Sequence, residues 1–257
     1  MKEPIRISGI IITYNEEKNI TRCLESLKGI CDEIVVVDSF STDQTKTICT
    51  TLGVSFFERS WTGFLDQKNF AQEKASHNIV LQLDADEVIS TELAESINTV
   101  KGNWTHDAYR FNRFNNFCGK WIKHSGWYPE LRLRLYDRRK GYWGGLDPHP
   151  SVSMEKSTTI SILEGNLLHY SYDHHIDLTI RSAEYAKQAA ISMNKLGKTA
   201  SNFKIFMRPV FRFIQDYFFK RGFLDGPEGL LICKTAAYYT FLKYLYLKLI
   251  NQGKSIE

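Results

Sequence analysis

The feature that most constrains the fold is a series of short apolar segments that alternate with segments of helical periodicity. Residues 5–13 (IRISGIIIT) are rich in β-branched side chains, and apolar residues at helical spacing follow in residues 20–27. The same order recurs in residues 33–38 and 45–52, and a third short apolar segment occupies residues 54–57. Continuously apolar strands are buried on both faces, and strands joined through helices form right-handed parallel crossovers. The sequence therefore predicts an α/β fold with a Rossmann-like, mostly parallel sheet and helices on both faces.

Acidic residues directly follow the next predicted strand. A helix is expected over residues 67–75, and the apolar segment at residues 78–83 runs into Asp84-Ala-Asp86-Glu87. In open α/β sheets, ligands bind at the carboxyl ends of the strands. Two carboxylates one residue apart can hold a hard divalent cation, Mg²⁺ or Mn²⁺, that bridges a diphosphate. The alternative is a turn at the end of a strand with solvated carboxylates.

Polar residues also follow the first two predicted strands. Their hydroxyl, amide and carboxylate groups are of the kinds that bind a base and a ribose. These residues are Thr13, Asn15, Glu16, Asp38 and Ser39. Two simpler interpretations stay open: Glu16 is a charge favoured at a helix N-terminus, and Asp38 caps the turn that follows it.

The texture of the sequence changes after Lys101, where aromatic and basic residues become frequent. We interpret residues 1–176 as one domain with two halves: 1–101, whose polar strand ends suit a nucleotide, and 102–176, whose aromatic and basic residues suit a sugar-containing acceptor. Aromatic rings can stack on sugars and guanidinium groups can bind phosphate or carboxylate. The predicted acceptor residues are Trp127, Tyr128, Arg132 and Arg134. The alternative is a half-exposed strand with aromatic core neighbours.

Residues 177–257 are predicted to be helical, with a Pro and Gly break at GFLDGPEG between two amphipathic segments. Basic residues interleave with Phe, Tyr and Leu here, which suits an interfacial helix on anionic lipid. A helical subdomain with solvated basic residues is the alternative. No stretch reaches the roughly 20 apolar residues that span a bilayer, so we expect no membrane-spanning segment. The N-terminus shows no signal-peptide cleavage pattern, so we expect no signal peptide.

Composition excludes some classes of protein. Hydrophobic residues make up 43% and charged residues 24% of the 257 residues, which is typical of a folded protein. The formal charge of +4 is too small to indicate nucleic acid as a partner. The five cysteines show no CxxC spacing and cannot all pair, so reduced thiols in the cytoplasm are expected.

The motifs IIITYNEE, VVVDSFSTDQT, QKNFA and LQLDADE, in this order, resemble family 2 glycosyltransferases of the GT-A fold. The later segments HSGWYPELRLRLYDR and LLHYSYDHHIDLTIRSAEYAKQAA, with RFIQDYFFKRGFLDGPEGLL, are similar to bacterial lipopolysaccharide core glucosyltransferases. The resemblance implies an inverting transfer of glucose from UDP-glucose to an inner-core heptose, at the cytoplasmic face of the inner membrane. It places Glu16 and Asp38 near the uridine, Gln67 and Lys68 near the donor, and Asp84 and Asp86 on the metal. Lys68 alone is also compatible with an exposed helix lysine.

An inverting transfer needs a base for the acceptor hydroxyl, and two carboxylates are available. Asp147 lies in GGLDPHPSV, where related transferases commonly carry an acidic pair or a His-Glu pair. This chain has Asp-Pro-His-Pro at residues 147–150 instead, and this difference leaves Glu130 as the alternative base. His149 is predicted to complete the metal sphere, or else to be a loop histidine between two prolines. Transfer to a capsular or exopolysaccharide glycan from another nucleotide sugar remains an alternative, as does a non-catalytic glycan-binding module.

Overall fold

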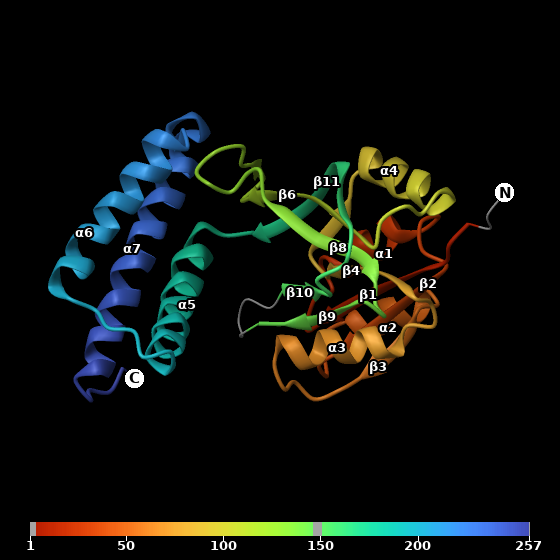
Figure 1. The fold of residues 1–257 in the computed structure, drawn as a ribbon, viewed down its shortest axis with the longest axis horizontal. Helices are drawn as coiled ribbons and strands as arrows, with labels where there is room; N and C mark the ends of the chain where they lie inside the picture. The colour runs from red at the N-terminus through yellow and green to blue at the C-terminus, as the bar shows by residue number, and fades with distance from the viewer. Residues whose placement is uncertain (1–3, 146–150, 257) are drawn as a thin grey trace. The chain divides into compact units, whose positions relative to one another are not determined.

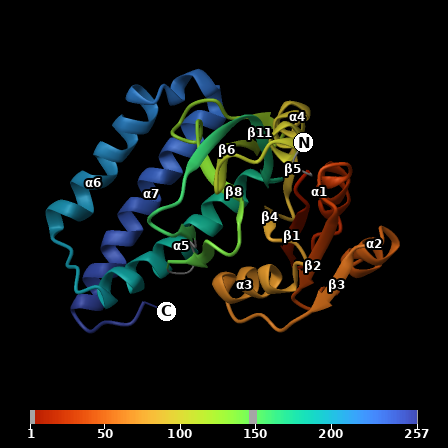
Figure 2. The ribbon, with the colours of Figure 1, turned by 45° about the vertical axis from the view of Figure 1, so that its right-hand side comes forward.

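The computed structural model describes residues 4–145 and 151–256, which form two compact units. The first unit comprises Met1–Arg113 and Glu130–His169, and the second comprises Phe114–Pro129 and Tyr170–Glu257. Figure 1 shows the ribbon with the element labels used below, and Figure 2 shows it turned.

The first unit contains the strands and helices that the apolar segments predict. Its elements are β1 (Ile7–Thr13), α1 (Ile20–Leu27), β2 (Glu33–Asp38), α2 (Thr45–Thr51), β3 (Ser55–Glu58), α3 (Phe64–Lys74), β4 (Ile79–Asp84), β5 (Glu87–Ile89), α4 (Thr91–Gly102), β8 (Leu131–Asp137), β9 (Gly141–Gly144) and β10 (Ser151–Met154). Two further strands, β6 (Ala108–Phe117) and β11 (Ile160–Tyr172), begin in the first unit and end in the second.

The main sheet has the strand order β3-β2-β1-β4-β8-β6-β11-β5. Strands β1 to β4 pair in parallel, as continuous apolar segments joined by helices require. Strand β8 pairs antiparallel with β4 and β6, and β5 pairs antiparallel with β11. Strands β9 and β10 form a separate two-stranded sheet. The carboxyl ends of β1, β2 and β4 therefore meet at one edge of the parallel part.

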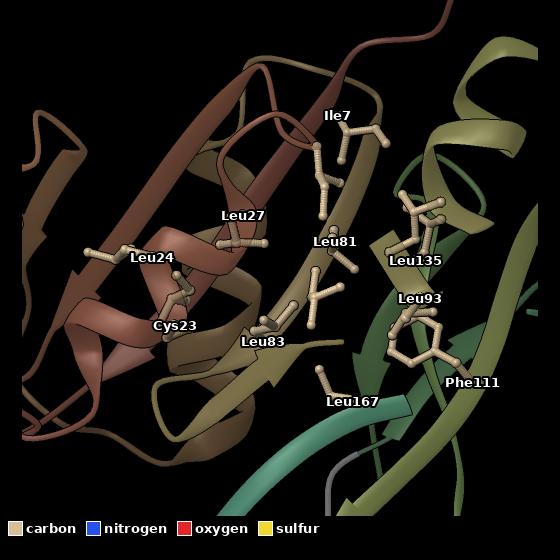
Figure 3. Close-up of a cluster of buried hydrophobic side chains, with 14 of the residues drawn as sticks. Ile7, Cys23, Leu24, Leu27, Leu81, Leu83, Leu93, Phe111, Leu135 and Leu167 are labelled. Carbon is tan, nitrogen blue, oxygen red and sulfur yellow. The ribbon is translucent and has the colours of Figure 1, made fainter. Parts of the chain in front are cut away.

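Apolar side chains cover both faces of the sheet. On one face the strands pack against Leu24 and Leu27 of α1 and Leu93 of α4 (Figure 3). On the other face they pack against Ala71 of α3 and Ala75, which directly follows that helix. All five side chains are buried. The predicted α/β architecture with helices on both faces is confirmed.

The second unit is mainly helical. It contains β7 (Lys120–Trp121), α5 (His175–Lys195), α6 (Asn202–Ile214), the π-helical turn η1 (Gln215–Phe219), the 3₁₀ turn η2 (Gly222–Asp225) and α7 (Gly226–Asn251). Helix α7 packs against both α5 and α6, and begins at the predicted Pro and Gly break. A second break, between α5 and α6, was not predicted; Gly197 ends α5 there with φ +69°. Within the described residues, no helix is both long and apolar enough to cross a membrane.

Candidate active site

Two cations meet the carboxylate of Asp84 at the end of β4. Lys68 Nζ, from α3, lies 2.6 Å from Asp84 Oδ1, and Arg134 Nη2, from β8, donates to Asp84 Oδ2 at 2.8 Å. Both cationic side chains are buried, with Lys68 4% exposed. The interpretation of Lys68 as an exposed helix lysine is therefore wrong. Arg134 was predicted to bind the acceptor, but its guanidinium forms ion pairs with Asp84 and Glu87 instead.

The electrostatics of this cluster favour the charged forms of its carboxylates. Burial alone would raise the pKa of Asp84, but Arg134 and Lys68 outweigh burial and hold that pKa well below its usual range. Burial lowers the pKa of Lys68, and Asp84 offsets part of this effect. The ring of Trp143 lies 4.4 Å from Lys68 Nζ and adds a cation–π contact. The site is thus a dense set of alternating charges at a sheet edge.

Glu87 extends the cluster into the core. Its side chain is fully buried, and its Oε2 accepts a hydrogen bond from the Asp84 backbone N–H at 2.9 Å. Its Oε1 accepts from Arg134 Nη2 at 2.8 Å and lies 3.6 Å from Arg113 Nη1. Neither Glu87 nor Arg113 was predicted as a site residue, although Glu87 directly follows the acidic motif. Their contribution is to fix the position of Arg134, and so of Asp84.

Asp86 has a histidine as its neighbour. His169 Nε2, from β11, lies 3.3 Å from Asp86 Oδ2, and both side chains are partly exposed. Burial raises the pKa of Asp86, but His169 and, to a smaller extent, Arg113 lower it, and the net shift is downward. His169 enters through the antiparallel pairing of β11 with β5, in which it is the partner of Glu87. The local sequence gives no signal for this contact, because the two strands lie about eighty residues apart.

The donor atoms at Asp86 fit a divalent cation in part. A carboxylate oxygen beside an imidazole nitrogen is a combination that Mn²⁺ accepts. Within the residues that the structure describes, no group of three or more His, Cys, Asp or Glu side chains could hold a metal. Cations that act on phosphates are commonly held by one or two protein ligands, with phosphate and water completing the sphere. Asp86 and His169 would meet that requirement.

The loop after β1 contacts the loop after β2. Asn15, with φ 53°, accepts a hydrogen bond from the Thr42 backbone N–H at 2.8 Å, and its own N–H donates to Ser41 Oγ. The Glu16 backbone N–H donates to Thr45 Oγ1 at 2.8 Å. Helix α1 begins only at Ile20 and has no acidic residue in its first turn. Glu16 therefore precedes the helix and lies in the loop at the sheet edge.

The predicted residues at the end of β2 are also brought together. Asp38 is fully buried and its Oδ2 accepts from the Ser41 backbone N–H at 2.7 Å, which is the predicted turn cap. The Ser39 N–H donates to the carbonyl of Thr13 at 3.0 Å, and Ser39 Oγ accepts from Gln67 Nε2 at 3.0 Å. A cap does not prevent a second role, so contact of these residues with the donor stays a prediction.

Of the two predicted bases, only Glu130 lies within the described residues; Asp147 and the predicted ligand His149 fall outside them. Glu130 accepts two hydrogen bonds from Arg113, at 2.8 and 3.1 Å, and also pairs with Arg132. A carboxylate held by two guanidinium groups is fixed in position, with its oxygens occupied by their N–H donors. This geometry favours a positioning role for Glu130.

The predicted acceptor aromatics belong to the second unit. Trp127 stacks on Tyr172 with ring centroids 6.1 Å apart, and Tyr128 contacts Phe114 at 4.9 Å. The segment before them is anchored by Asp225, which is 3% exposed. Its carboxylate accepts from the backbone N–H groups of residues 123 and 124, from Ser125 Oγ at 2.9 Å, and lies 3.0 Å from the Nδ1 atom of residue 124.

Replacing Arg134 by Met is expected to lower the free energy of unfolding by about 3–5 kcal/mol, because it leaves the buried Glu87 carboxylate without its main partner. Arg132→Met, on the same strand but 41% exposed, is the matched control and should change it by under about 1 kcal/mol. Urea denaturation followed by circular dichroism measures both. Equal stability of the two variants would contradict the structural role given to Arg134.

Comparisons with known proteins bear on this arrangement. An uncharacterised glycosyltransferase of Rickettsia typhi is 31% identical over 255 residues, covering 95% of this chain and 87% of the relative. The lipopolysaccharide core biosynthesis glycosyltransferase LpsC of Rhizobium meliloti is 27% identical over 249 residues, covering 92% and 89%. The mannosyltransferase PcManGT from Pyrobaculum calidifontis, solved in complex with GDP-Man and Mn²⁺, has a similar fold, with a TM-score of 0.55 at 16% identity over 96% of this chain and 88% of that one.

The family model "Glycosyl transferase family 2" matches residues 8–157. That range holds the parallel strands, the Asp84-Ala-Asp86 turn and both cations that meet it. The resemblance carried by the four sequence motifs is thereby confirmed, and the chain belongs to the family 2 glycosyltransferases.

Proposed function

We propose that the chain transfers glucose from UDP-glucose, with inversion, to a heptose of the lipopolysaccharide inner core. The observation that carries the proposal is the meeting of Lys68 and Arg134 at Asp84, at the carboxyl end of a parallel strand. Buried cations held in place before the reaction stabilise the charge that develops on a departing diphosphate. The similarity to LpsC, which is named for core biosynthesis, supports the class of acceptor.

The loops after β1 and β2 would bind the nucleoside of the donor. They offer backbone and side-chain hydrogen-bonding groups that surround one sheet edge. The residues proposed for this role are Thr13, Asn15, Glu16, Asp38, Ser39 and Gln67. Lys68 would bind the phosphates, and Asp84 would orient Lys68 and the sugar nucleotide.

A divalent cation, Mn²⁺ or Mg²⁺, is proposed as the cofactor. The predicted ligands Asp84, Asp86 and His149 are proposed to hold it, together with His169, which lies beside Asp86. When bound, such an ion neutralises the leaving diphosphate as a Lewis acid. The presence of Mn²⁺ in the PcManGT complex supports this choice of ion. His169 also contacts Asp86 directly, with Nε2 3.3 Å from Asp86 Oδ2, and this contact lowers the pKa of Asp86.

On the acceptor side, Asp147 is proposed to take the proton of the attacking hydroxyl, with Glu130 orienting Arg132 and Arg113. Trp127 and Tyr128 would stack on the acceptor sugars, and Arg132, which is partly exposed, would bind an acidic group on them. The acceptor is lipid-linked, and we place the reaction at the cytoplasmic face of the inner membrane.

A donor screen tests the proposal. Purified protein is incubated with UDP-glucose, UDP-galactose, UDP-N-acetylglucosamine or GDP-mannose, with and without Mn²⁺, and the released nucleoside diphosphate is measured. We expect UDP release from UDP-glucose that rises when a heptose-containing core acceptor is added. Preference for another donor, or for an acceptor without heptose, would replace the proposed reaction by transfer to another bacterial glycan.

A further inference from the structure

Helix α6 carries an apolar stripe that faces away from the rest of its own unit. Ile205, 4% exposed, lies on the side of α6 that packs against α7. At about 100° per residue, Val210 and Ile214 fall on the opposite side of the helix, and Phe206 lies between that side and Ile205. Phe206 is 66% exposed and Val210 is 50% exposed. Figures 1 and 2 both show α6 running beside α7.

The stripe continues beyond α6 into η1. We call it the α6 aromatic surface, and it consists of Phe203, Phe206, Val210, Phe211, Phe218 and Phe219. Phe219 is 80% exposed, although Phe is among the residues most often buried. Soluble proteins rarely expose several large apolar side chains on one short segment, and large exposed apolar patches mark interaction sites.

Positive charge borders the α6 aromatic surface. Lys204 and Arg208, four residues apart on one flank of α6, lie beside the stripe. Among residues 202–224, all of which the structure describes, Asp216 is the single acidic residue. It is fully buried and forms ion pairs with Arg212 and Lys220. The exposed charge of the segment is therefore entirely positive.

We infer that the α6 aromatic surface inserts into an anionic lipid bilayer, with the bordering cations at the level of the headgroups. A helix with an apolar face and a basic border lies in the plane of such an interface. A second copy of this surface would bring the same cations and no exposed carboxylate, whereas anionic lipid supplies the missing negative charge. Membrane binding by this surface rests on the proposed function in one respect only, that the lipid-linked acceptor lies in the same bilayer.

Vesicle flotation of the full chain tests the inference without any sugar donor. We expect the protein to float with phosphatidylcholine vesicles that contain phosphatidylglycerol, and to bind far less to phosphatidylcholine alone. Lys204→Gln/Arg208→Gln should weaken partition into the anionic vesicles by about 30-fold, from roughly fivefold per cation. Phe206→Ser/Phe211→Ser/Phe218→Ser should abolish it.

Ile160→Ser/Ile162→Ser removes exposed apolar residues from β11 and is the matched control, which should float like the unmodified protein. Flotation of the Phe triple variant at the normal level would overturn the inference. So would light scattering that shows a dimer without lipid, converted to a monomer by the same variant. UDP release in solution separates the two proposals, because a protein that floats without releasing UDP contradicts only the transfer reaction.

Discussion

Asp86→Ala is expected to abolish transfer while the fold is retained. Asp86 is a predicted metal ligand beside His169, whereas the Asp84 carboxylate already accepts from Lys68 and Arg134, so we expect the loss of Asp86 to cost the most. Loss of a metal that stabilises charge in the transition state costs several kcal/mol, and each 1.4 kcal/mol is tenfold in rate. We therefore expect kcat to fall by about 1,000-fold or more.

The measurement is UDP release over a range of Mn²⁺ concentrations, with circular dichroism as the check on folding. Glu95→Ala, an exposed acid on α4, is the matched control and should retain normal kcat. His169→Ala should raise the Mn²⁺ concentration needed for half-maximal rate by at least about 10-fold. Full activity of the unmodified protein in EDTA would sink the metal assignment, even if Asp86→Ala were inactive.

The second large effect is expected at Asp147. Removing a general base lowers kcat by roughly 10²- to 10⁴-fold, and Asp147→Asn should do so with little change in the KM for the donor. Asp147 follows a Gly-Gly pair and precedes Pro148, a sequence that favours an extended backbone and close approach to a substrate.

Glu130→Gln is the matched comparison. Because Glu130 is held by Arg113 and Arg132, its loss should release these guanidinium groups and raise the KM for the acceptor more than it lowers kcat. Steady-state kinetics of the two variants distinguish the roles. Near-normal turnover in Asp147→Asn together with an inactive Glu130→Gln would reverse the assignment.

The elements of the parallel sheet were predictable because their signals are local. The predicted helix at residues 20–27 has the same bounds as α1, and the strand ending at Asp38 has the same end as β2. Buried strands and the helices that join them can be predicted from apolar periodicity over fewer than ten residues. The placement of Asp84 at a strand end followed from the same reasoning, since β4 ends at that residue.

The partners of the site residues were not predictable in the same way. His169 reaches Asp86 through the pairing of β11 with β5, and Arg134 reaches Asp84 through the pairing of β8 with β4. Such registers depend on contacts between distant segments, which a periodic pattern does not encode. Lys68 shows the same limit, because α3 buries it through contacts with β4 and Trp143 that its own sequence does not reveal.

Asp225 gives the C-terminal helices a task beyond their own stability. This single buried carboxylate receives three consecutive residues, 123–125, from the segment that leads to Trp127 and Tyr128, and it sits at the start of α7. Truncation of the chain before α6 would therefore remove Asp225 and its hydrogen bonds to that segment, as well as the α6 aromatic surface. Within the second unit, the same helices therefore support both the residues proposed to bind the sugar and those proposed to bind lipid. Truncation would disturb both functions together, whereas point substitutions can change one without the other.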